Sequence, residues 1–170
     1  SYFQGDNLPV ENVSWDDCQE FIDKLNQITG ENFSLPTEAQ WEFAARGGNK
    51  SKGYKYSGSN DIDAVAWYWY WDLEDLLDHP DAKSHPVGTK QANELGIYDM
   101  SGNVWEWCYD WYGPYSSVAI TDPSGPSSGS NRVLRGGSWN SGATGCRCTD
   151  RNDDTPTSAY FTLGLRLALK

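Results

Sequence analysis

The sequence predicts one domain that combines two helices with short strands and many irregular connections. Its 170 residues, 38% of them hydrophobic, are sufficient for one domain with its own core. Two helical patterns with capping signals occupy residues 14–30 and 36–47. Seventeen glycines and eight prolines are dispersed without a period, which indicates turns rather than a repeat or low-complexity sequence.

Charge and hydropathy exclude several functional classes. The formal net charge is −11, and binding to nucleic acid needs a basic face that displaces counterions from phosphate, so we expect no nucleic-acid partner. No apolar run approaches the about 20 residues that span a bilayer, so we expect no direct membrane insertion. The compartment stays open, with a cell-surface or phage-associated location considered if an upstream signal or anchor has been removed.

The domain is assigned to residues 6–170. Residues 1–5 read as a tag or loop remnant, and we leave them out of the functional interpretation. Residues 48–60 read as a loop without core content, and residues 113–131 as a loop rich in Pro, Gly and Ser.

The first helical pattern starts at Ser14, which we expect to be the N-cap, with Asp16 and Asp17 in the first turn. It ends before Gly30. Apolar residues recur at helical spacing and predict one buried face: Cys18, Phe21, Ile22, Leu25 and Ile28.

The second helical pattern carries signals at both ends. Thr37 and Gln40 have the spacing of a capping box, and Gly47 stands where a helix C-terminus needs a left-handed residue. Residues 32–35 alternate and predict a short strand, and residues 85–88 and 93–98 predict two further short strands bounded by turns.

An aromatic run extends from Trp67 to Trp71 and is followed by acidic residues. It reads either as a core strand before a solvated acidic turn, or as an aromatic platform for a ligand. Leu73, Leu76 and Leu77 have helical spacing within the acidic part.

The four cysteines are too few and too irregularly spaced for a disulfide scaffold or a zinc knuckle. We expect buried thiols at Cys18, Cys108, Cys146 and Cys148.

A contrast in composition marks the C-terminal part. Residues 132–139 and 163–169, called the frame, are apolar and glycine-rich, with arginines and one tryptophan. Residues 140–162 between them, called the display segment, contain no Lys, Glu, Gln, Met, Ile, Leu, Val or Trp. The sequence therefore predicts a polar segment held by a rigid frame.

Two carboxylates flank a Gly-Asn turn, at Asp99 and Glu106. Hard oxygen donors in a turn suit calcium, although two carboxylates cannot fill its about 6–8 ligand positions. The alternative is a capped turn that precedes a Trp-rich core strand.

Five ordered motifs resemble the formylglycine-generating enzyme family, also called the sulfatase-modifying factor family. They are Ser14-Trp15, the stretches 35–47 and 96–107, Arg135-Gly-Gly-Ser-Trp139 and Leu163-Gly-Leu-Arg166. The resemblance covers residues 6–169 and implies a C-type-lectin-like fold of α+β class, with two helices, small antiparallel sheets and abundant irregular loop. It also implies a calcium site in which the Asp99 and Glu106 side chains join the carbonyls of Gly102 and Val104.

Enzymes of this family carry a copper-binding cysteine pair shortly after the Gly-Gly-Ser-aromatic motif. In this chain the first of these positions falls at Ser141, and neither Cys146 nor Cys148 matches the pair. A hydroxyl is a poor ligand for Cu(I), which prefers thiolates. We therefore expect no copper and no oxidase activity.

The frame and display segment are more similar to the variable proteins of diversity-generating retroelements, in which adenine-directed mutagenesis rewrites selected codons. Residues 132–169 correspond to their variable region. The residue types present are reachable from an Asn codon by changing its adenines, whereas Lys, Glu, Gln, Met and Trp, which are absent, are not.

This resemblance implies a non-catalytic ligand-binding protein, with an unidentified protein or surface ligand as partner. A fixed-sequence binding module of the same family and an atypical oxidase are the alternatives. Short polar and aromatic side chains suit adaptable recognition. The expected ligand-facing set is Asn140, Ser141, Thr144, Thr149, Asp150, Asn152, Asp153, Asp154, Tyr160, Phe161 and Thr162.

Other residues are assigned to the scaffold. We expect the arginine guanidiniums to bond loop carbonyls or carboxylates. This group comprises Arg135, Trp139, Arg147, Arg151 and Arg166. The aromatic run at 67–71 is expected to wall one side of the display segment.

Overall fold

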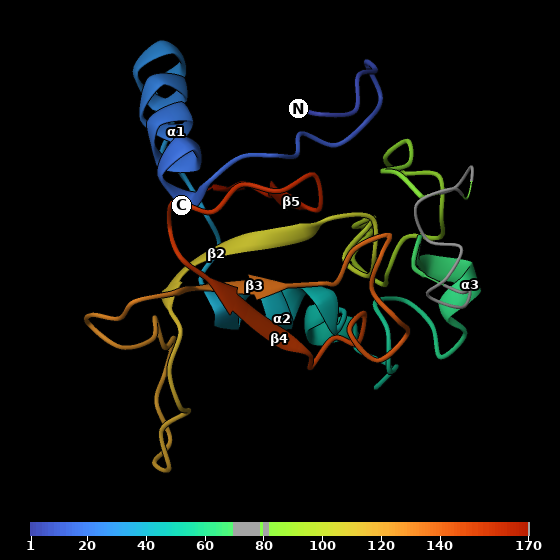
Figure 1. Ribbon diagram of the computed structural model, residues 1–170. Helices are drawn as coiled ribbons and strands as arrows, with labels where there is room; N and C mark the ends of the chain where they lie inside the picture. The colour runs from blue at the N-terminus through green and yellow to red at the C-terminus, as the bar shows by residue number, and fades with distance from the viewer. Residues whose placement is uncertain (70–78, 80–81, 170) are drawn as a thin grey trace.

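A computed structural model describes residues 1–69, 79 and 82–169. The fold is of the α+β class, as predicted (Figure 1). The helices are α1 (Trp15–Thr29), α2 (Glu38–Ala45), α3 (Ile62–Val65) and the 3-10 turn η1 (Gly48–Lys50). The strands are β1 (Phe33–Ser34), β2 (Trp105–Trp111), β3 (Arg132–Arg135), β4 (Arg151–Asp154), β5 (Leu163–Leu165) and β6 (Ala168–Leu169).

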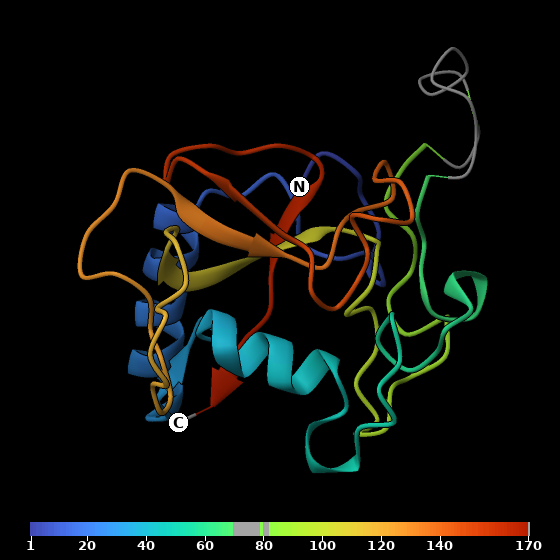
Figure 2. The same ribbon diagram turned by 90° about the horizontal axis from the view of Figure 1, so that it is seen from below.

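The central element is a four-stranded sheet in the order β4-β3-β2-β5. β3 pairs antiparallel with both β2 and β4, whereas β5 runs parallel to β2. A separate two-stranded sheet joins β1 to β6. Figure 2 shows α2 running along one side of the larger sheet.

Two core clusters lie on opposite faces of this sheet. Successive side chains of a strand point to opposite faces, so Trp107 and Cys108 of β2 face different sides. Trp107 and Leu134 pack with Ile22 of α1, whereas Cys108 packs with Trp41 of α2. The sheet is therefore covered by α1 on one face and by α2 on the other.

The start of α1 is confirmed at Ser14. Its hydroxyl accepts from the backbone N–H of Asp17, whose carboxylate accepts from the Ser14 N–H, each at 3.0 Å. The predicted buried face is partly wrong, because only Cys18 and Ile22 are buried, while Phe21 is 50% and Ile28 83% exposed. The helix contacts the sheet along a narrower strip than its apolar spacing suggested.

The ends of α2 are confirmed as well. The Thr37 hydroxyl accepts from the Gln40 N–H at 3.2 Å, and the Gln40 side chain accepts from the Thr37 N–H at 2.9 Å. Gly47 follows the helix with φ +88°, the left-handed conformation that ends many helices.

Several expectations about the loops are wrong. Residues 48–60 do contribute to the core, because Tyr56 is only 4% exposed and packs with Val65 and Cys146. Residues 85–88 and 93–98 form turns rather than strands. The buried Asn93 side chain organises the second of these turns, because its Oδ1 accepts from the N–H groups of Leu95 and Ile97.

Other local predictions are confirmed. The short strand within residues 32–35 is β1, and residues 113–131 form an irregular loop, drawn in yellow and orange in Figure 1. The region Asp72–Asp78, with the leucine pattern, lies outside the described residues, as do Tyr70 and Trp71 of the aromatic run. No helix within the described ranges is long and apolar enough to cross a bilayer.

Two isoleucines of α1 provide a matched test of this packing. Ile22→Ala leaves a cavity in the core and is expected to lower the free energy of unfolding by about 2–5 kcal/mol. Ile28→Ala, at an exposed position of the same helix, should change it by less than about 0.5 kcal/mol. Urea unfolding followed by tryptophan fluorescence measures both, and equal losses would contradict the placement of α1.

Candidate functional site

Arg135 holds the frame and the display segment together. Its side chain is fully buried at the end of β3. The guanidinium donates to the carbonyl oxygens of Asp150 and Cys148, the latter at 2.9 Å, and pairs with the carboxylate of Glu42 on α2. One arginine thus fixes the far end of the 140–150 loop to both the sheet and a helix.

Arg151 anchors the next part of the display segment. Its Nε and Nη2 atoms donate to the two oxygens of Glu38 at 2.8 and 2.6 Å, and Nη1 donates to the Gly113 carbonyl at 2.8 Å. The guanidinium lies over the rings of Tyr112 and Tyr115, at 4.3 and 4.2 Å from their centres. The paired hydrogen bonds and the ring contacts restrict β4 at its first residue.

Two further scaffold assignments have different outcomes. Arg166 donates from Nε and Nη2 to the carboxylate of Glu106, at 3.0 and 2.8 Å, as expected of a scaffold residue. Arg147 does not show the expected bonding, because its buried Nε has no hydrogen-bond partner among the described residues.

The predicted ligand-facing residues fall into two groups. Those with exposed side chains are Asn140, Thr144, Thr149, Asn152, Tyr160 and Phe161. Those of intermediate exposure are Ser141, Asp150, Asp153, Asp154 and Thr162. None of the eleven is buried, whereas Cys146 and Cys148 of the same segment point into the core.

Some members of the half-buried group also support the local backbone. The Ser141 hydroxyl accepts from the Ser138 N–H at 3.0 Å. Asp153 accepts from the Asn131 side chain at 2.5 Å, and Asp154 accepts from the Thr155 N–H at 2.7 Å. Two exposed side chains do the same, because Asn140 accepts from the Ser138 hydroxyl at 2.6 Å and Asn152 accepts from the Asp153 N–H at 3.0 Å.

Trp139 brings the two ends of the display segment together. Its ring stacks on Phe161 with centroids 5.8 Å apart and planes 23° apart. Trp139 is 3% exposed and Phe161 38%, so the tryptophan forms the floor under the phenylalanine. Asn140 follows Trp139 directly, which places exposed residues from both ends of the segment at one location.

The N-terminal residues, which we left out of the functional interpretation, also belong here. The Phe3 ring lies 6.2 Å from Trp139 and 6.3 Å from Phe161, and the Tyr2 ring lies 5.7 Å from Phe161. The Phe3 N–H donates to the Glu11 carboxylate at 2.8 Å. Adjacent aromatics within such a short polar segment were the one signal for this contact.

The aromatic run contributes to the site through one residue. The Trp69 backbone N–H donates to the Ser141 carbonyl at 2.8 Å, so Trp69 lies beside the display segment. Trp67 instead stacks on His85, with centroids 4.0 Å apart, and its ring lies 4.1 Å from the Lys90 ammonium. Tyr68 packs against the core cluster that contains Cys146, so the described part of the run supplies one wall residue and two packed residues.

The residues expected to hold calcium do not fit that ion. Glu106 already accepts from Trp41 Nε1 at 2.6 Å and from Arg166 at both carboxylate oxygens. The Asp99 carboxylate accepts from the Gly88 N–H at 2.7 Å, and burial raises the pKa of Asp99. An adjacent guanidinium repels a divalent cation, and the hydrogen bonds that these carboxylates already make occupy acceptor positions that calcium would need.

Calcium removal tests this geometry directly. A site saturated at 100 times its dissociation constant would add about 2.7 kcal/mol and raise Tm by roughly 5–10 °C. We expect no shift on that scale when calcium or EGTA is added. A calcium-dependent rise in Tm that is lost in both Asp99→Ala and Glu106→Ala would restore the original expectation.

The four cysteines are free and buried, as predicted. Burial raises the pKa of Cys146 to about 12 and that of Cys148 to about 11. Cys146 packs with Tyr56, whereas Cys148 packs with Trp41 in a different cluster. The two thiols are thus neutral and separately packed, and this donor set does not fit a copper-binding pair.

Thiol accessibility follows from this burial. We expect the folded protein to react slowly with an aromatic disulfide reagent at mildly alkaline pH, because buried thiols are neither ionised nor accessible. After unfolding in guanidinium, all four cysteines should react at once. Rapid modification of Cys146 or Cys148 in the folded protein, identified by mass spectrometry, would contradict the assignment.

The comparisons with known proteins agree with this architecture. A model of the sulfatase-modifying factor enzyme 1-like domain matches residues 1–170. The formylglycine-generating enzyme of Streptomyces coelicolor is 35% identical over 95% of the chain. The chain spans about half the length of this relative, 52%.

Solved structures are similar over nearly the whole chain. Treponema denticola variable protein 1 matches with a TM-score of 0.84 and 32% identity, covering 96% of this chain and 71% of that one. PvdO from Pseudomonas aeruginosa matches with a TM-score of 0.81 and 27% identity, covering 99% of this chain and 64% of that one. The likenesses confirm the C-type-lectin-like fold that the sequence motifs predicted.

Proposed function

The chain belongs to the family of sulfatase-modifying factor enzyme 1-like domains, and on that premise we propose that it is a non-catalytic binding protein. Its ligand-facing surface is the display segment, residues 140–162, and its sequence there is diversified by a retroelement. The partner is a protein or another surface ligand that contacts the exposed polar and aromatic side chains.

One observation carries the proposal. Buried arginines fix the backbone of a segment whose exposed side chains have few structural duties. Arg135 and Arg151 hold the backbone and edge strand by bonds to carbonyls and to α2 carboxylates. Thr144 and Thr149 are exposed between these anchors, and Asn152 is exposed directly after the second. Such a surface can change its side chains and keep its fold, which is what a diversified binding face requires.

The chemistry of the loop supports binding over catalysis. Ser141, where the family's enzymes carry their first copper-binding cysteine, has a hydroxyl that bonds to Ser138. The nearby thiols of Cys146 and Cys148 are buried. The likeness to a protein named variable protein 1 supports the same interpretation, although fold alone does not determine function.

Tolerance to substitution tests the display surface. In one variant, Asn140, Thr144, Thr149, Asn152 and Tyr160 are each replaced by another residue of the display type, for example Asn140→Tyr and Tyr160→Ser. We expect a change of less than about 0.5 kcal/mol for each position, because exposed side chains contribute little to stability. Urea unfolding measures the sum.

The matched control is Arg135→Met, which keeps the volume of a buried side chain and removes its charge. It should cost about 3–5 kcal/mol, because Glu42 and two loop carbonyls lose their partner. A loss of several kcal/mol in the free energy of unfolding of the five-position variant would contradict the proposal that these side chains are free to change.

The coding DNA separates a diversified surface from a fixed binding module. We expect a second, near-identical copy of the segment encoding residues 135–166, with adenines at the differing positions, beside a reverse transcriptase gene. Absence of such a copy rules out diversification. Turnover of a cysteine peptide after copper addition, abolished by Cys146→Ser or Cys148→Ser, would instead favour an oxidase.

A further inference from the structure

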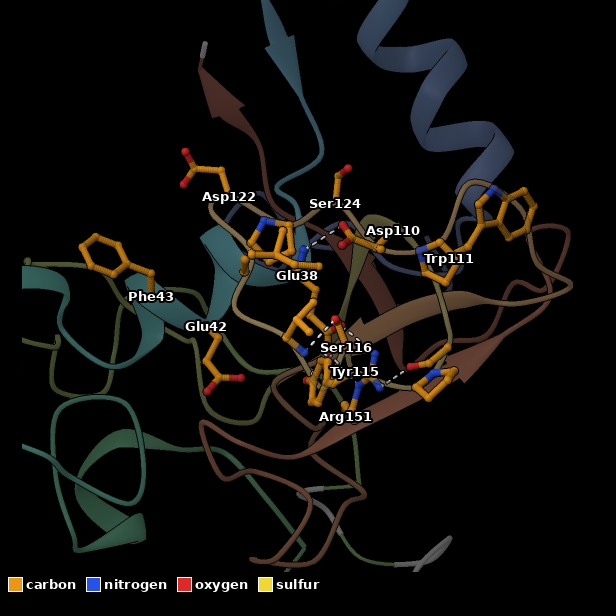
Figure 3. Close-up of a pocket in the computed structure, with 18 of the residues that line it drawn as sticks. Glu38, Glu42, Phe43, Asp110, Trp111, Tyr115, Ser116, Asp122, Ser124 and Arg151 are labelled. Carbon is orange, nitrogen blue, oxygen red and sulfur yellow. Dashed lines mark hydrogen bonds and ion pairs between the residues drawn. The ribbon is translucent and has the colours of Figure 1, made fainter.

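A cavity of about 830 Å³ lies apart from the exposed display residues. It is enclosed by α2, the end of β2 and the loop at 113–126, and Figure 3 shows side chains from these three elements around it. Arg151 is the one residue of the display segment that lines it. The volume is in the range of sites for small organic ligands or for side chains of a partner.

The mouth of the cavity is apolar and uncovered. Phe43 of α2 is 56% exposed, and Tyr115, Val118 and Ile120 of the loop are 65%, 69% and 57% exposed. Large exposed apolar side chains that cluster around one concavity mark a binding surface more often than exposed apolar residues that are scattered singly. The described structure places no other segment over them.

The charged lining has an excess of carboxylates. Glu38 is bonded at both oxygens by Arg151, and Glu42 pairs with Arg46 at 2.7 Å. The carboxylates of the lining are Glu38, Glu42, Asp110 and Asp122, and its guanidiniums are Arg46 and Arg151. The buried Arg135 guanidinium, behind the lining, also pairs with Glu42, so four carboxylates face three guanidiniums and leave a charge of −1. Asp110 and Asp122 form no ion pair with the described residues.

Asp110 is built into the wall. The residue is 3% exposed, and its Oδ2 accepts from the Glu38 N–H at 2.9 Å, at the N-terminus of α2. The carboxylate also accepts from the backbone N–H of Asp110 itself. Among the described residues no cationic group lies within ion-pair distance of Asp110. Burial raises the pKa of this carboxyl, and a cation bound beside it would favour the charged form.

The loop is seated closely on this carboxylate. Gly125 has φ +74°, and a Cβ at this position would lie 3.0 Å from Asp110 Cβ and 3.0 Å from the Trp111 carbonyl oxygen. Only glycine allows the backbone to approach so closely in this conformation. Asp110 is therefore held at the inner end of the cavity, while Ile120 and Val118 are at its mouth.

We propose that this cavity binds an organic cation with an apolar body, a primary ammonium or guanidinium group attached to an aromatic or alkyl skeleton. The cationic group donates to Asp110 and is attracted by Asp122, and the skeleton packs against Phe43 and Ile120. A bare metal ion does not suit the apolar mouth, whereas an amphipathic cation matches both parts. The proposal does not rest on the function proposed for the display segment.

Three small ligands of matched shape test the charge requirement. They are phenethylamine, 2-phenylethanol and phenylacetate, titrated into the full chain and followed by NMR. Hydrogen bonds to charged groups are the stronger class, so we expect the amine to bind at least about tenfold more tightly than the alcohol, and phenylacetate not to bind. Equal binding of amine and alcohol, or no binding of the amine, overturns the proposal.

Matched variants locate the binding. Asp110→Asn keeps the acceptor for the Glu38 N–H and removes the charge, and it should reduce amine affinity to that of the alcohol. Asp23→Asn, the same change at an exposed position of α1, should leave affinity unchanged. An unchanged affinity in a folded Asp110→Asn variant, or an equal loss in Asp23→Asn, contradicts the proposed site.

A second pair of variants tests the cavity if the Asp110→Asn variant fails to fold. Ile120→Ser should weaken binding of both amine and alcohol, whereas Ile28→Ser, at an exposed apolar position outside the cavity, should not. Loss of binding in Ile28→Ser, or none in Ile120→Ser, counts against the cavity.

A peptide distinguishes the two possible sources of the cation, a small amine and a basic side chain of a protein ligand. An acetylated Phe-Lys amide that binds as tightly as phenethylamine, and more tightly than its norleucine analogue, assigns the cavity to a basic side chain of a protein ligand. Binding of phenethylamine alone assigns it to a small amine. Both outcomes support binding of an organic cation in the cavity. If neither ligand binds, the function proposed for the display segment is not affected.

Discussion

The structure depends on one buried guanidinium, that of Arg135. A charge removed from water is costly unless it is paired and hydrogen-bonded, and here the partners of the two Nη atoms come from separate parts of the chain. The Nε atom makes no hydrogen bond with a described residue and lies 3.7 Å from a Glu38 carboxylate oxygen. Glu42 belongs to α2, and the carbonyls of Cys148 and Asp150 belong to the display segment. Pairing the Arg135 charge therefore requires that α2, the sheet and the loop at 140–150 be in place together.

Similar pairs surround this centre. Arg151 bonds Glu38 of α2, and Arg166 of the C-terminal frame bonds Glu106 of β2. Each pair joins the C-terminal part of the chain to a residue far earlier in sequence. The irregular loops thus rest on a few directional contacts, because short polar residues cannot supply a hydrophobic core of their own.

Local signals in the sequence predicted the ends of the helices well. Ser14 and Thr37 act as N-caps because capping depends on residues within one turn. The apolar residues of the frame marked it as rigid, and the structure shows that it contains the strands β3 and β5. β4 could not be predicted, because Asn152 and Asp153 are poor strand formers, and pairing with β3 determines their conformation.

The candidate site was predictable in outline but not in its contacts. Composition alone marked residues 140–162 as different, and all eleven chosen residues have at least intermediate exposure. The packing of Tyr2 and Phe3 onto Phe161 joins the two ends of the chain, which sequence spacing does not reveal. The contacts of Glu106, expected as a calcium ligand, could not be predicted either, because its partners Arg166 and Trp41 are distant in sequence.

The pairing of β2 has a consequence for how this chain can change in length. Glu106 lies opposite Arg135 on one side and Gly164 on the other, so β3 and β5, which flank the display segment, are about 10 Å apart, two strand spacings. Between them the segment returns to the sheet once, as the edge strand β4. Strand pairing in the sheet offsets the entropic cost of closing the loop between β3 and β5. This cost grows only slowly as residues are added. Insertions in the turns at 141–149 should be accommodated, whereas one within Arg151–Asp154 would shift the register of the edge strand.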